Sequence, residues 1–504
     1  MKLATTLASA QAAAAASLSG IVAPKDLDVT SQISIRNVAA TVAFEAMSSY
    51  SGNKTDPKSR EFGNVSKPYY WWVAGALWGA LLDYYHYTSD PSYNNVVLQA
   101  LLAPTNLGAG KDYMPAEHAD EEGNDDLHFW GAAVLSAAER NFPQPNPSLP
   151  SWLDISANVF DQLAGRWDTQ FCGGGLFWQI LPSNPNGMKY KNSVSNGGFF
   201  QLAARMARAT GNSTYLQWAD KVWDWSADVG FIDNATYRIY DGAGIDSQCR
   251  TVNRKSFSYT TGIYLYGAAI MADHTGDDKW VRRTQRLLDE AAAYFFTGSD
   301  NTTMWEPACE ASDSCNYDMI TFKGYLARYM WQSARIMPSI KDKVRSLLVP
   351  TSRAAAATCT GGASGHQCGM KWYVGGFDGV ATLGGQMCAL ETIQGLLSGD
   401  APAPLAAKDI TWNRNATFQP IDTYANLDTA AAASASQSSA QSSTQSQSST
   451  QSPTQSPTEA PKPVPTSSQP KKNGAAKASF TGLAGGAWPL LIGATLAAAL
   501  LGWA

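Results

Sequence analysis

Two kinds of helical stretch alternate along most of this chain, and that alternation restricts the fold more than any other feature. Stretches of the first kind carry charged residues on one side and apolar residues on the other, as surface helices do. They cover residues 35–51, 93–103, 151–167, 214–230, 278–296 and 340–349. Stretches of the second kind are small and aromatic on nearly every side, which predicts helices surrounded by protein. They cover residues 69–87, 125–142, 196–210, 259–275, 319–336 and 379–397.

The spacing of the buried stretches predicts a closed ring. Successive members begin roughly 60 residues apart, as in a chain built from internal repeats. Six inner helices alternating with six outer helices predict an all-α (α/α)6 toroid in a single domain. An open solenoid, whose repeats stack without closing, is the alternative. In the toroid, the loops that enter the inner helices meet at one end, so a cleft with functional residues is expected there.

The ends of the chain predict export from the cell. Residues 1–20 begin with one positive charge, Lys2, followed by an alanine-rich run, which is the layout of a signal peptide. A disordered tail is the alternative. Residues 21–425 are expected to form the folded domain. Residues 426–473 are rich in Ser, Thr, Gln and Pro and lack large apolar side chains, so they are expected to form an extended, O-glycosylated stalk.

Residues 474–504 have the pattern of a GPI-attachment signal that is removed from the mature protein. Asn473, Gly474 and Ala475 are small, a spacer follows, and an apolar run ends the chain without basic residues behind it. Asn473 is the predicted attachment residue. A simple C-terminal membrane anchor is the alternative. The mature protein is therefore expected at the cell surface, attached through a lipid to the plasma membrane or held within the cell wall.

Glycosylation acceptors and cysteines agree with an extracellular compartment. N-x-Ser/Thr sequences occur at Asn53, Asn64, Asn212, Asn234, Asn301 and Asn415. The seven cysteines offer two short-range pairs, one longer-range pair and an odd residue: Cys309 with Cys315, Cys359 with Cys368, Cys172 with Cys249, and Cys388. Sequence alone does not fix this connectivity. Because zinc-type C-x-x-C spacing is absent, disulfides are favoured over a metal site, and no metal or cofactor is expected. The net charge of −5 argues against nucleic acid as a partner.

Asp125 and Asp126 stand together at the start of the second inner stretch, "NDDLHFWG". An acidic residue near a helix start is ordinary, because it caps the helix and interacts favourably with the helix dipole. Here, however, Phe129 and Trp130 follow directly, in a chain with seventeen tryptophans. Aromatic rings beside carboxylates are typical of carbohydrate sites.

Two carboxyl groups with unequal protonation are what glycoside hydrolysis requires. In a retaining enzyme one attacks the sugar and the other protonates the leaving oxygen, at a separation of about 5–5.5 Å. Adjacent residues at a helix start can provide this separation. Ionisation of one then raises the pKa of its neighbour, which keeps a proton available for the acid role.

Several longer motifs resemble the fungal cell-wall members of glycoside hydrolase family 76. They are "PYYWWVAGALWGALLDYYHYTSDPSYN", "DYMPAEHADEEGNDDLHFWGAAVLSAAERNF", "CGGGLFWQI", "YKNSVSNGGFFQLAARMARATGN", "WDWSADVGFI", "YDGA", "TFKGYLARYM" and "CGMKW". The resemblance implies an (α/α)6 fold and retaining endo-1,6-α-mannosidase chemistry, with Asp125 as nucleophile and Asp126 as general acid/base. It also implies a mannan or GPI-core glycan substrate, and transfer of mannoproteins to a β-glucan acceptor as an alternative to hydrolysis.

The chain departs from the family pattern at two positions. Val73 stands where the family usually has an acid in Trp-Trp-Glu-Ala-Gly, and Leu127 stands where it often has Gln. Loss of a cleft carboxylate and of an amide would alter the recognition of sugars. Two other classes therefore stay open: a noncatalytic glycan-binding or adhesion protein with the same cleft, and a different (α/α)6 hydrolase.

Further candidates for substrate binding lie near the starts of inner stretches or beside loop glycines. They are Trp71, Trp72, Trp130, Asp241, Phe322, Gly324, Trp372 and Asp378. The aromatic residues could equally be core residues, and an aspartate before a glycine is often a turn residue. Lys323 is interpreted as a structural ion-pair partner.

Overall fold

Helices dominate the structure, a computed structural model that describes residues 22–182 and 187–414. The longer helices are α2 (Gln32–Ser48), α3 (Trp71–Thr88), α4 (Asn94–Leu102), α6 (Asn124–Glu139), α7 (Trp152–Gly165), α8 (Ser193–Thr210), α9 (Ser213–Asp228), α10 (Ser258–Thr275), α11 (Asp278–Tyr294), α12 (Tyr317–Ile336), α13 (Lys341–Ala357) and α14 (Leu383–Gln394), and a single turn, α5 (Pro104–Leu107), follows α4.

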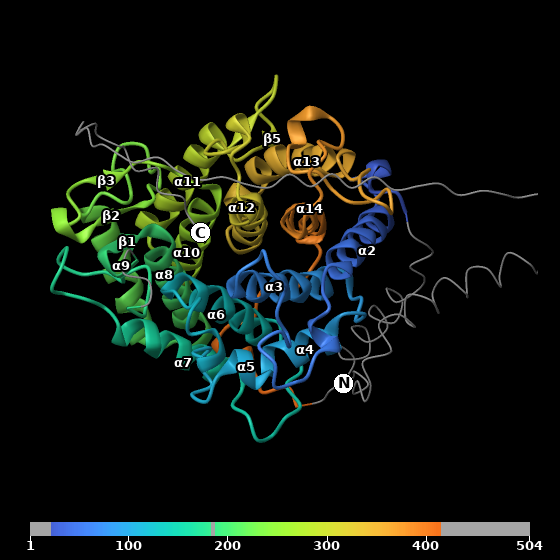
Figure 1. Cartoon of the computed structure of the whole chain (residues 1–504). Coiled ribbons are helices and arrows are strands. Elements are labelled where there is room, and N and C mark those ends of the chain that lie inside the picture. The colour runs from blue at the N-terminus through green and yellow to red at the C-terminus, as the bar shows by residue number, and fades with distance from the viewer. Residues whose placement is uncertain (1–21, 183–186, 415–504) are drawn as a thin grey trace, which may run out of the picture. The chain divides into compact units, whose positions relative to one another are not determined.

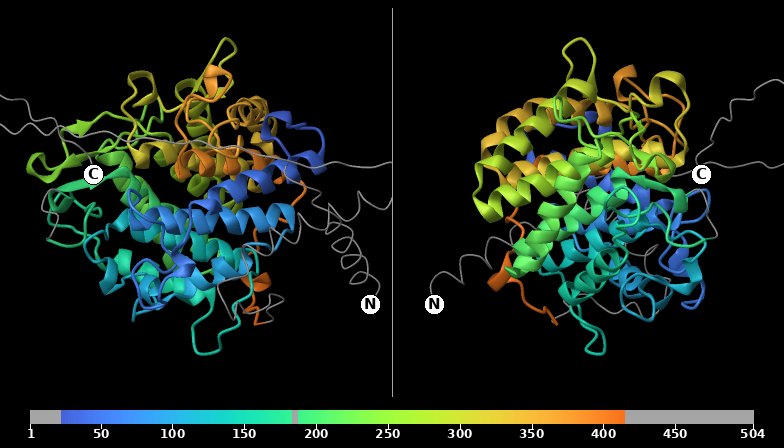
Figure 2. Two further views of the ribbon diagram at one scale, coloured as in Figure 1. Left: turned by 45° about the vertical axis from the view of Figure 1, so that its right-hand side comes forward. Right: turned by 90° about the vertical axis from the view of Figure 1, so that its left-hand side faces the viewer.

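Helices α3, α6, α8, α10, α12 and α14 form a closed inner ring. Each packs against the next in this order, and α14 packs against α3, so the two ends of the series meet (Figure 1). Helices α2, α4, α7, α9, α11 and α13 each pack against an inner helix. Figure 2 shows the orange C-terminal helices beside the blue N-terminal ones. The predicted (α/α)6 toroid is confirmed, and the open solenoid is wrong for this chain.

The strands are short and belong to the loops that precede inner helices. β1 (Tyr190–Asn192), β2 (Gly242–Gly244) and β3 (Val252–Asn253) form an antiparallel sheet in that order, with Lys191 opposite Ala243. β4 (Phe296–Thr297) pairs with β5 (Thr303–Met304). Since β1 runs directly into α8, this sheet lies at the N-terminal ends of the inner helices.

Two of the tight turns that join an inner helix to the next outer helix have the same sequence pattern, a glycine followed by a capping residue. α8 ends at Gly211 and α10 at Gly276, both in the left-handed region, with φ of 72° and 66°. Glycine adopts this conformation without steric cost, so it terminates helices efficiently. The next residue then caps the outer helix: Asn212 accepts a hydrogen bond from the N–H of Thr214, at 2.9 Å. Asp277 does the same for Lys279, at 2.7 Å.

Small residues let the inner helices approach one another closely. A methyl group on Gly262 of α10 would lie 2.9 Å from Cα of Leu326 in α12. Such a distance is below the normal contact of two carbons, so only glycine fits. The small-residue stripes of the buried stretches therefore pack helix against helix.

Charged side chains inside the ring are paired. On α3, Asp83 is fully buried and accepts hydrogen bonds from Arg328 Nε at 2.7 Å and Gln332 Nε2 at 2.9 Å. It also forms an ion pair with Arg140. Because these partners come from α12 and the end of α6, Asp83 links three positions around the ring.

We expect Asp83→Asn to lower the free energy of unfolding by about 3–5 kcal/mol, because it removes the carboxylate that the buried Arg328 and Arg140 share and leaves Arg328 only the longer pair with Glu391. The control is Asp289→Asn, which removes an exposed ion pair with Lys343 and should cost less than about 1 kcal/mol. Chemical denaturation measures both. Equal effects would show that the interior pair contributes no more than a surface pair.

Three disulfides join the cysteine pairs that the sequence offered: Cys172–Cys249, Cys309–Cys315 and Cys359–Cys368. Cys388 is a buried free thiol. Within the described residues, no helix is both long and apolar enough to cross a membrane.

Residues 398–414 cross the C-terminal ends of the inner helices. The N–H of Leu405 donates to the carbonyl of Glu139, the last residue of α6, at 2.7 Å. Arg335 Nε of α12 donates to the carbonyl of Ala401 at 2.9 Å. The last described residues therefore lie at the end of the ring opposite the starts of the inner helices.

Candidate active site

Asp125 and Asp126 lie in the first turn of α6, and their carboxyl groups converge on Gly123. The N–H of Gly123 donates a hydrogen bond to Asp126 Oδ2 at 2.7 Å. A methyl carbon on Gly123 would lie 2.5 Å from Asp125 Oδ1 and 2.5 Å from Asp126 Oδ2. The two oxygens can therefore be separated by no more than twice that distance. This upper bound reaches the lower end of the spacing of about 5–5.5 Å between the carboxyl groups of retaining glycosidases.

The surroundings of the two carboxyl groups give them different pKa values. Burial raises the pKa of Asp125 to about 7, although hydrogen bonds from its own N–H and from that of Asp126 oppose the shift. Burial also raises the pKa of Asp126, and the charges of Asp125 and Asp318 raise it further. The second carboxyl therefore holds the shared proton, and Asp125 ionises first. Asp125 Oδ1 has no hydrogen-bond partner among the described residues.

The loop before β1 fixes the start of α6. The carbonyl of Trp178 accepts a hydrogen bond from the N–H of Asn124 at 2.9 Å, and Asn124 Nδ2 donates to the carbonyl of Phe177 at 2.8 Å. Arg166 Nε donates to Asn124 Oδ1 at 2.8 Å. In addition, a hydrogen bond from the Trp178 side chain favours the ionised form of Asp125 and thereby lowers its pKa. Asn124 is thus a positioning residue, and Trp178 contacts the candidate nucleophile.

A buried lysine and a disulfide hold this loop in place. Lys191 of β1 donates to Asp168 Oδ2 at 2.7 Å and to the carbonyls of Phe171 and Gly174, at 2.8 and 2.6 Å. The disulfide joins Cys172 of the same loop to Cys249. Because its ends are anchored, the loop presents Trp178 to α6 in a fixed position.

Two further carboxyls lie near the pair. Asp241 is buried; its Oδ2 accepts hydrogen bonds from Tyr190 Oη at 2.7 Å and Asn253 Nδ2 at 2.9 Å, and burial raises its pKa to about 6. Asp318 Oδ1 accepts a hydrogen bond from Trp72 Nε1 at 3.2 Å, and burial raises its pKa to about 6 as well.

Tyr259 lies within electrostatic range of three of these carboxyls. Burial raises the pKa of its hydroxyl, and the charges of Asp241, Asp125 and Asp318 raise it further, in that order. Its ring stacks on Phe322 at 3.8 Å. Sequence reasoning missed Trp178, Tyr259 and Asp318. Tyr259 and Asp318 lie in the first turns of inner helices, as Asp126 does. Their position in the sequence could therefore have identified them as site residues.

Two of the predicted sugar-binding tryptophans lie inside the core. Trp71 and Trp130 are fully buried, and their rings stack at 5.1 Å. His118 covers the far side of Trp71 at 5.2 Å, and Tyr113 covers that of Trp130 at 5.1 Å. The stack packs α3 against α6 and leaves neither tryptophan a free ring face for a sugar. We therefore correct their assignment as sugar-binding residues.

Trp72 differs from these two because its side chain contacts Asp318, a carboxyl near the pair. It is 8% exposed, its ring packs 4.5 Å from Phe129, and its indole N–H donates to Asp318. Phe129 follows Asp125 by one helical turn, so the two residues share one face of α6. Trp72 therefore remains a candidate for the floor of the site.

The remaining candidates divide between the site and the scaffold. Phe322 lies beside the site through its stack with Tyr259. Gly324, however, packs against α14, where a methyl group would lie 3.0 Å from Cα of Cys388. Trp372 is 1% exposed, under the ammonium of Lys323 at 4.1 Å. Gly324 and Trp372 thus have no accessible surface for a sugar, which corrects their assignment.

Asp378 holds a loop together. Its carboxylate accepts hydrogen bonds from the N–H groups of Met370, Lys371 and Val380, the shortest at 2.7 Å from Lys371. Its prediction as a sugar ligand is thus replaced by a structural role. Lys323 pairs with Glu310 at 2.7 Å, so its interpretation as a structural ion-pair partner is confirmed.

The positions that depart from the family pattern both face the core. Val73 is fully buried and Leu127 is 1% exposed. Neither side chain can touch a sugar directly. Their effect on the site is therefore limited to how the surrounding helices pack.

The predicted modification sites are distributed unevenly. Asn212, Asn234 and Asn301 are exposed, whereas Asn53 and Asn64 are buried, at 1% and 7% exposure. A buried amide cannot present itself to a glycosylating enzyme after folding. Asn415, the attachment residue Asn473, the signal peptide and the stalk lie outside the described residues.

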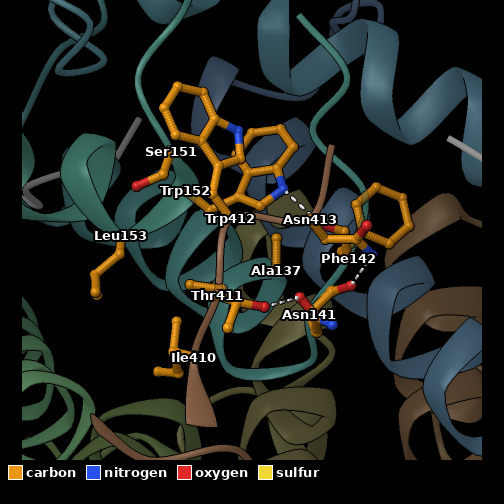
Figure 3. Close-up of a pocket in the computed structure, with 11 residues that line it drawn as sticks. Ala137, Asn141, Phe142, Ser151, Trp152, Leu153, Ile410, Thr411, Trp412 and Asn413 are labelled. Atoms are coloured by element: carbon orange, nitrogen blue, oxygen red, sulfur yellow. Dashed lines mark hydrogen bonds between the residues drawn. The ribbon is translucent and has the colours of Figure 1, made fainter. Parts of the chain in front are cut away.

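A small pocket of about 70 Å³ lies at the opposite end of α6 (Figure 3). Trp152, Phe142 and Trp412 line it, and Asn413 Nδ2 donates to the carbonyl of Asn141 at 2.9 Å. Its volume suits a few water molecules, and the length of α6, about 24 Å for sixteen residues, separates it from Asp125.

The described residues contain no group of three or more His, Cys, Asp or Glu side chains arranged to hold a metal ion.

Known proteins resemble this chain in both sequence and structure. Mannan endo-1,6-alpha-mannosidase DCW1 of Candida glabrata is 42% identical over 369 residues, which are 73% of this chain and 80% of that protein. The crystal structure of Dfg5 from Chaetomium thermophilum in complex with glucosamine has a TM-score of 0.72 at 36% identity, covering 81% of this chain and 100% of that one.

A more distant structure shares the fold. It is an inactive variant of the alpha-1,6-mannanase GH76A of Salegentibacter sp. HEL1_6 in complex with alpha-1,6-mannotriose, with a TM-score of 0.58 at 18% identity, covering 72% of this chain and 99% of that one. The sequence profile of glycosyl hydrolase family 76 matches residues 34–408. The ring of helices, the relatives and the matched profile agree, and the chain belongs to glycosyl hydrolase family 76.

Proposed function

We propose that this protein is a retaining endo-1,6-α-mannosidase or transglycosylase that acts on α-1,6-mannan or GPI-linked mannoglycan in fungal cell-wall biogenesis. The observation that carries the proposal is the convergence of two carboxyl oxygens on Gly123. The relatives support the substrate: one is named a mannan endo-1,6-alpha-mannosidase. The inactive mannanase variant, in which two consecutive aspartates are replaced by asparagine, supports the role of an adjacent pair.

The ionised carboxylate of Asp125 attacks the anomeric carbon of mannose while the bond to the leaving oxygen breaks. Asp126 gives its proton to that oxygen. In the second step Asp126, now ionised, takes a proton from the incoming acceptor, whose oxygen displaces Asp125 from the sugar. Two inversions at the same carbon give net retention. Water as acceptor gives hydrolysis, and a glucan hydroxyl gives transfer.

The sequence after the folded domain supports a role at the cell surface. Residues 426–473 have the composition of an extended stalk, and residues 474–504 have the pattern of a GPI-attachment signal. The protein is therefore proposed to be attached to the plasma membrane or held within the cell wall.

The pH dependence of kcat/KM should be bell-shaped. As pH falls through the pKa of Asp125, about 7, the nucleophile is protonated and activity falls about tenfold per pH unit. As pH rises through the higher pKa of Asp126, the acid loses its proton and activity falls again. Initial rates on α-1,6-mannotetraose across the pH range measure both limbs. An acid limb at the ordinary aspartate value of about 4 would contradict this electrostatic description.

Product analysis tests the proposed function. The purified protein is incubated with α-1,6- and α-1,2-linked mannooligosaccharides and with a GPI-core glycan, each with and without a β-glucan acceptor. We expect cleavage of α-1,6 linkages only, with α-configured products in early NMR spectra and glucan-linked products by mass spectrometry if transfer occurs. Binding without turnover of any mannoside would favour the noncatalytic glycan-binding alternative.

A further inference from the structure

We propose that Tyr317 and Asp318, at the start of α12, form a sugar-binding subsite near the catalytic pair for a mannose unit beyond the two that flank the cleaved bond. In this subsite Tyr317 supplies a ring face to the pyranose and Asp318 accepts hydrogen bonds from its hydroxyls. The inference rests on the proposed function and deepens it, because it names the residues that select for longer chains.

Two packed aromatic rings connect this position to α6, the helix that carries the aspartates. Phe129 lies one turn after Asp125 on α6, and the ring of Trp72 packs on it at 4.5 Å. The indole N–H of Trp72 then donates to Asp318 Oδ1 at 3.2 Å. The effect of the Asp318 charge on the pKa of Asp126 agrees with this proximity. The start of α12 therefore lies near the first turn of α6, and the rings of Trp72 and Phe129 link the two.

Tyr317 offers an exposed ring that packs against one neighbouring ring. It is 47% exposed, whereas most aromatic side chains in the described residues are buried. Its ring meets that of Tyr69 edge to face at 5.5 Å. Tyr69 is itself fixed, because its hydroxyl accepts a hydrogen bond from the N–H of Leu383 at 2.9 Å. A partly exposed tyrosine ring presents apolar area at low entropic cost, which suits the C–H face of a sugar.

Asp318 retains hydrogen-bonding capacity. Within the described residues its carboxylate accepts one hydrogen bond, at Oδ1 from Trp72. A carboxylate has about four acceptor sites, so the second oxygen can receive sugar hydroxyls. The side chain is mostly buried but keeps some exposed surface. Together with the adjacent ring, it combines the apolar and polar contacts that a pyranose requires.

The α12 subsite predicts a dependence on chain length. A disaccharide can fill the two positions that flank the cleaved bond without reaching Tyr317, whereas a longer chain gains a contact there. Removal of the ring should therefore weaken binding of long substrates selectively. A structural role at the helix start would instead change all substrates equally.

The test compares KM and kcat for α-1,6-mannobiose through mannohexaose. We expect Tyr317→Ala to raise KM for the longest substrates about tenfold, the loss of one stacking contact, with little change for the shortest. Tyr317→Phe, which keeps the ring, should behave like the wild type. Asp318→Asn should raise KM and shift the basic limb of the pH profile to lower pH, because a neighbouring negative charge is lost. The control is Phe44→Ala, an exposed ring on outer helix α2.

Two outcomes would overturn the subsite: KM changes that do not depend on chain length, or a Phe44→Ala effect equal to that of Tyr317→Ala. Calorimetric binding of α-1,6-mannohexaose to the same variants in an Asp126→Asn background gives a readout independent of turnover. If the wild-type protein binds mannohexaose but does not turn it over, only the proposed function is contradicted. If Tyr317→Ala binds mannohexaose as tightly as the protein with Tyr317, the subsite is contradicted.

Discussion

Asp125→Asn is expected to lower kcat on α-1,6-mannooligosaccharides by about four orders of magnitude or more, because an amide cannot form the covalent intermediate. Asp126→Asn is expected to lower it by about 10²–10⁴-fold, the usual contribution of a general acid/base. Both replacements keep the size of the side chain. Binding of the oligosaccharide should therefore survive in both variants while turnover is lost.

A substrate with a good leaving group separates the two roles. Departure of 2,4-dinitrophenolate needs no proton, so Asp126→Asn should still release it from an activated α-mannoside in a rapid first turnover. Asp125→Asn should not, because the attacking group itself is missing. Stopped-flow measurement of the released phenolate gives this comparison. A burst from Asp125→Asn and none from Asp126→Asn would reverse the assignment made from the relative pKa values.

Thermal unfolding serves as the control for both variants. Since burial raises the pKa values of both carboxyls, neutral asparagine in either place removes a desolvation cost. We therefore expect unfolding temperatures at or above that of the wild type. A large decrease would mean that the pair stabilises the fold, and the loss of turnover would then need another explanation.

The ring of helices could be predicted because its signal repeats along the chain. Each inner helix is apolar on all sides and each outer helix on one side, and this difference follows directly from burial. The disulfides, by contrast, could only be offered as possible pairs, since connectivity depends on which loops meet. Cys172 and Cys249 are brought together by the loop before β1 and the loop after β2, and no local pattern encodes that meeting.

The site was predictable where chemistry and helix position coincide, and less so elsewhere. The adjacency of Asp125 and Asp126 is visible in sequence. Whether an aromatic residue faces sugar or core is not, because a rotation of about 100° per residue separates the two directions along one helix. Trp71 and Trp72 illustrate this: the first lies in the core stack, and the second donates a hydrogen bond to Asp318.

Gly123 carries a requirement that sequence reasoning did not consider. Its φ and ψ of −115° and 167° are extended, so alanine could adopt the same backbone without strain. The obstacle is the side chain. A methyl carbon there would lie 2.5 Å from an oxygen of each aspartate and 3.1 Å from the carbonyl of Trp178. Both carboxyl groups would have to move, and with them the geometry of attack and protonation.

Gly123→Ala should therefore reduce kcat at least about a hundredfold, the cost of displacing reacting groups by about 1 Å. Stability should fall by only about 1–3 kcal/mol, as expected for one added methyl group in a packed site. The matched control is Gly165→Ala at the end of α7, where a methyl group meets nothing within 4 Å. That variant should keep full activity and gain about 0.4–1 kcal/mol of stability. If Gly123→Ala kept wild-type kcat, the two carboxyls would have freedom to rearrange, and catalysis could not depend on their being held against the start of α6.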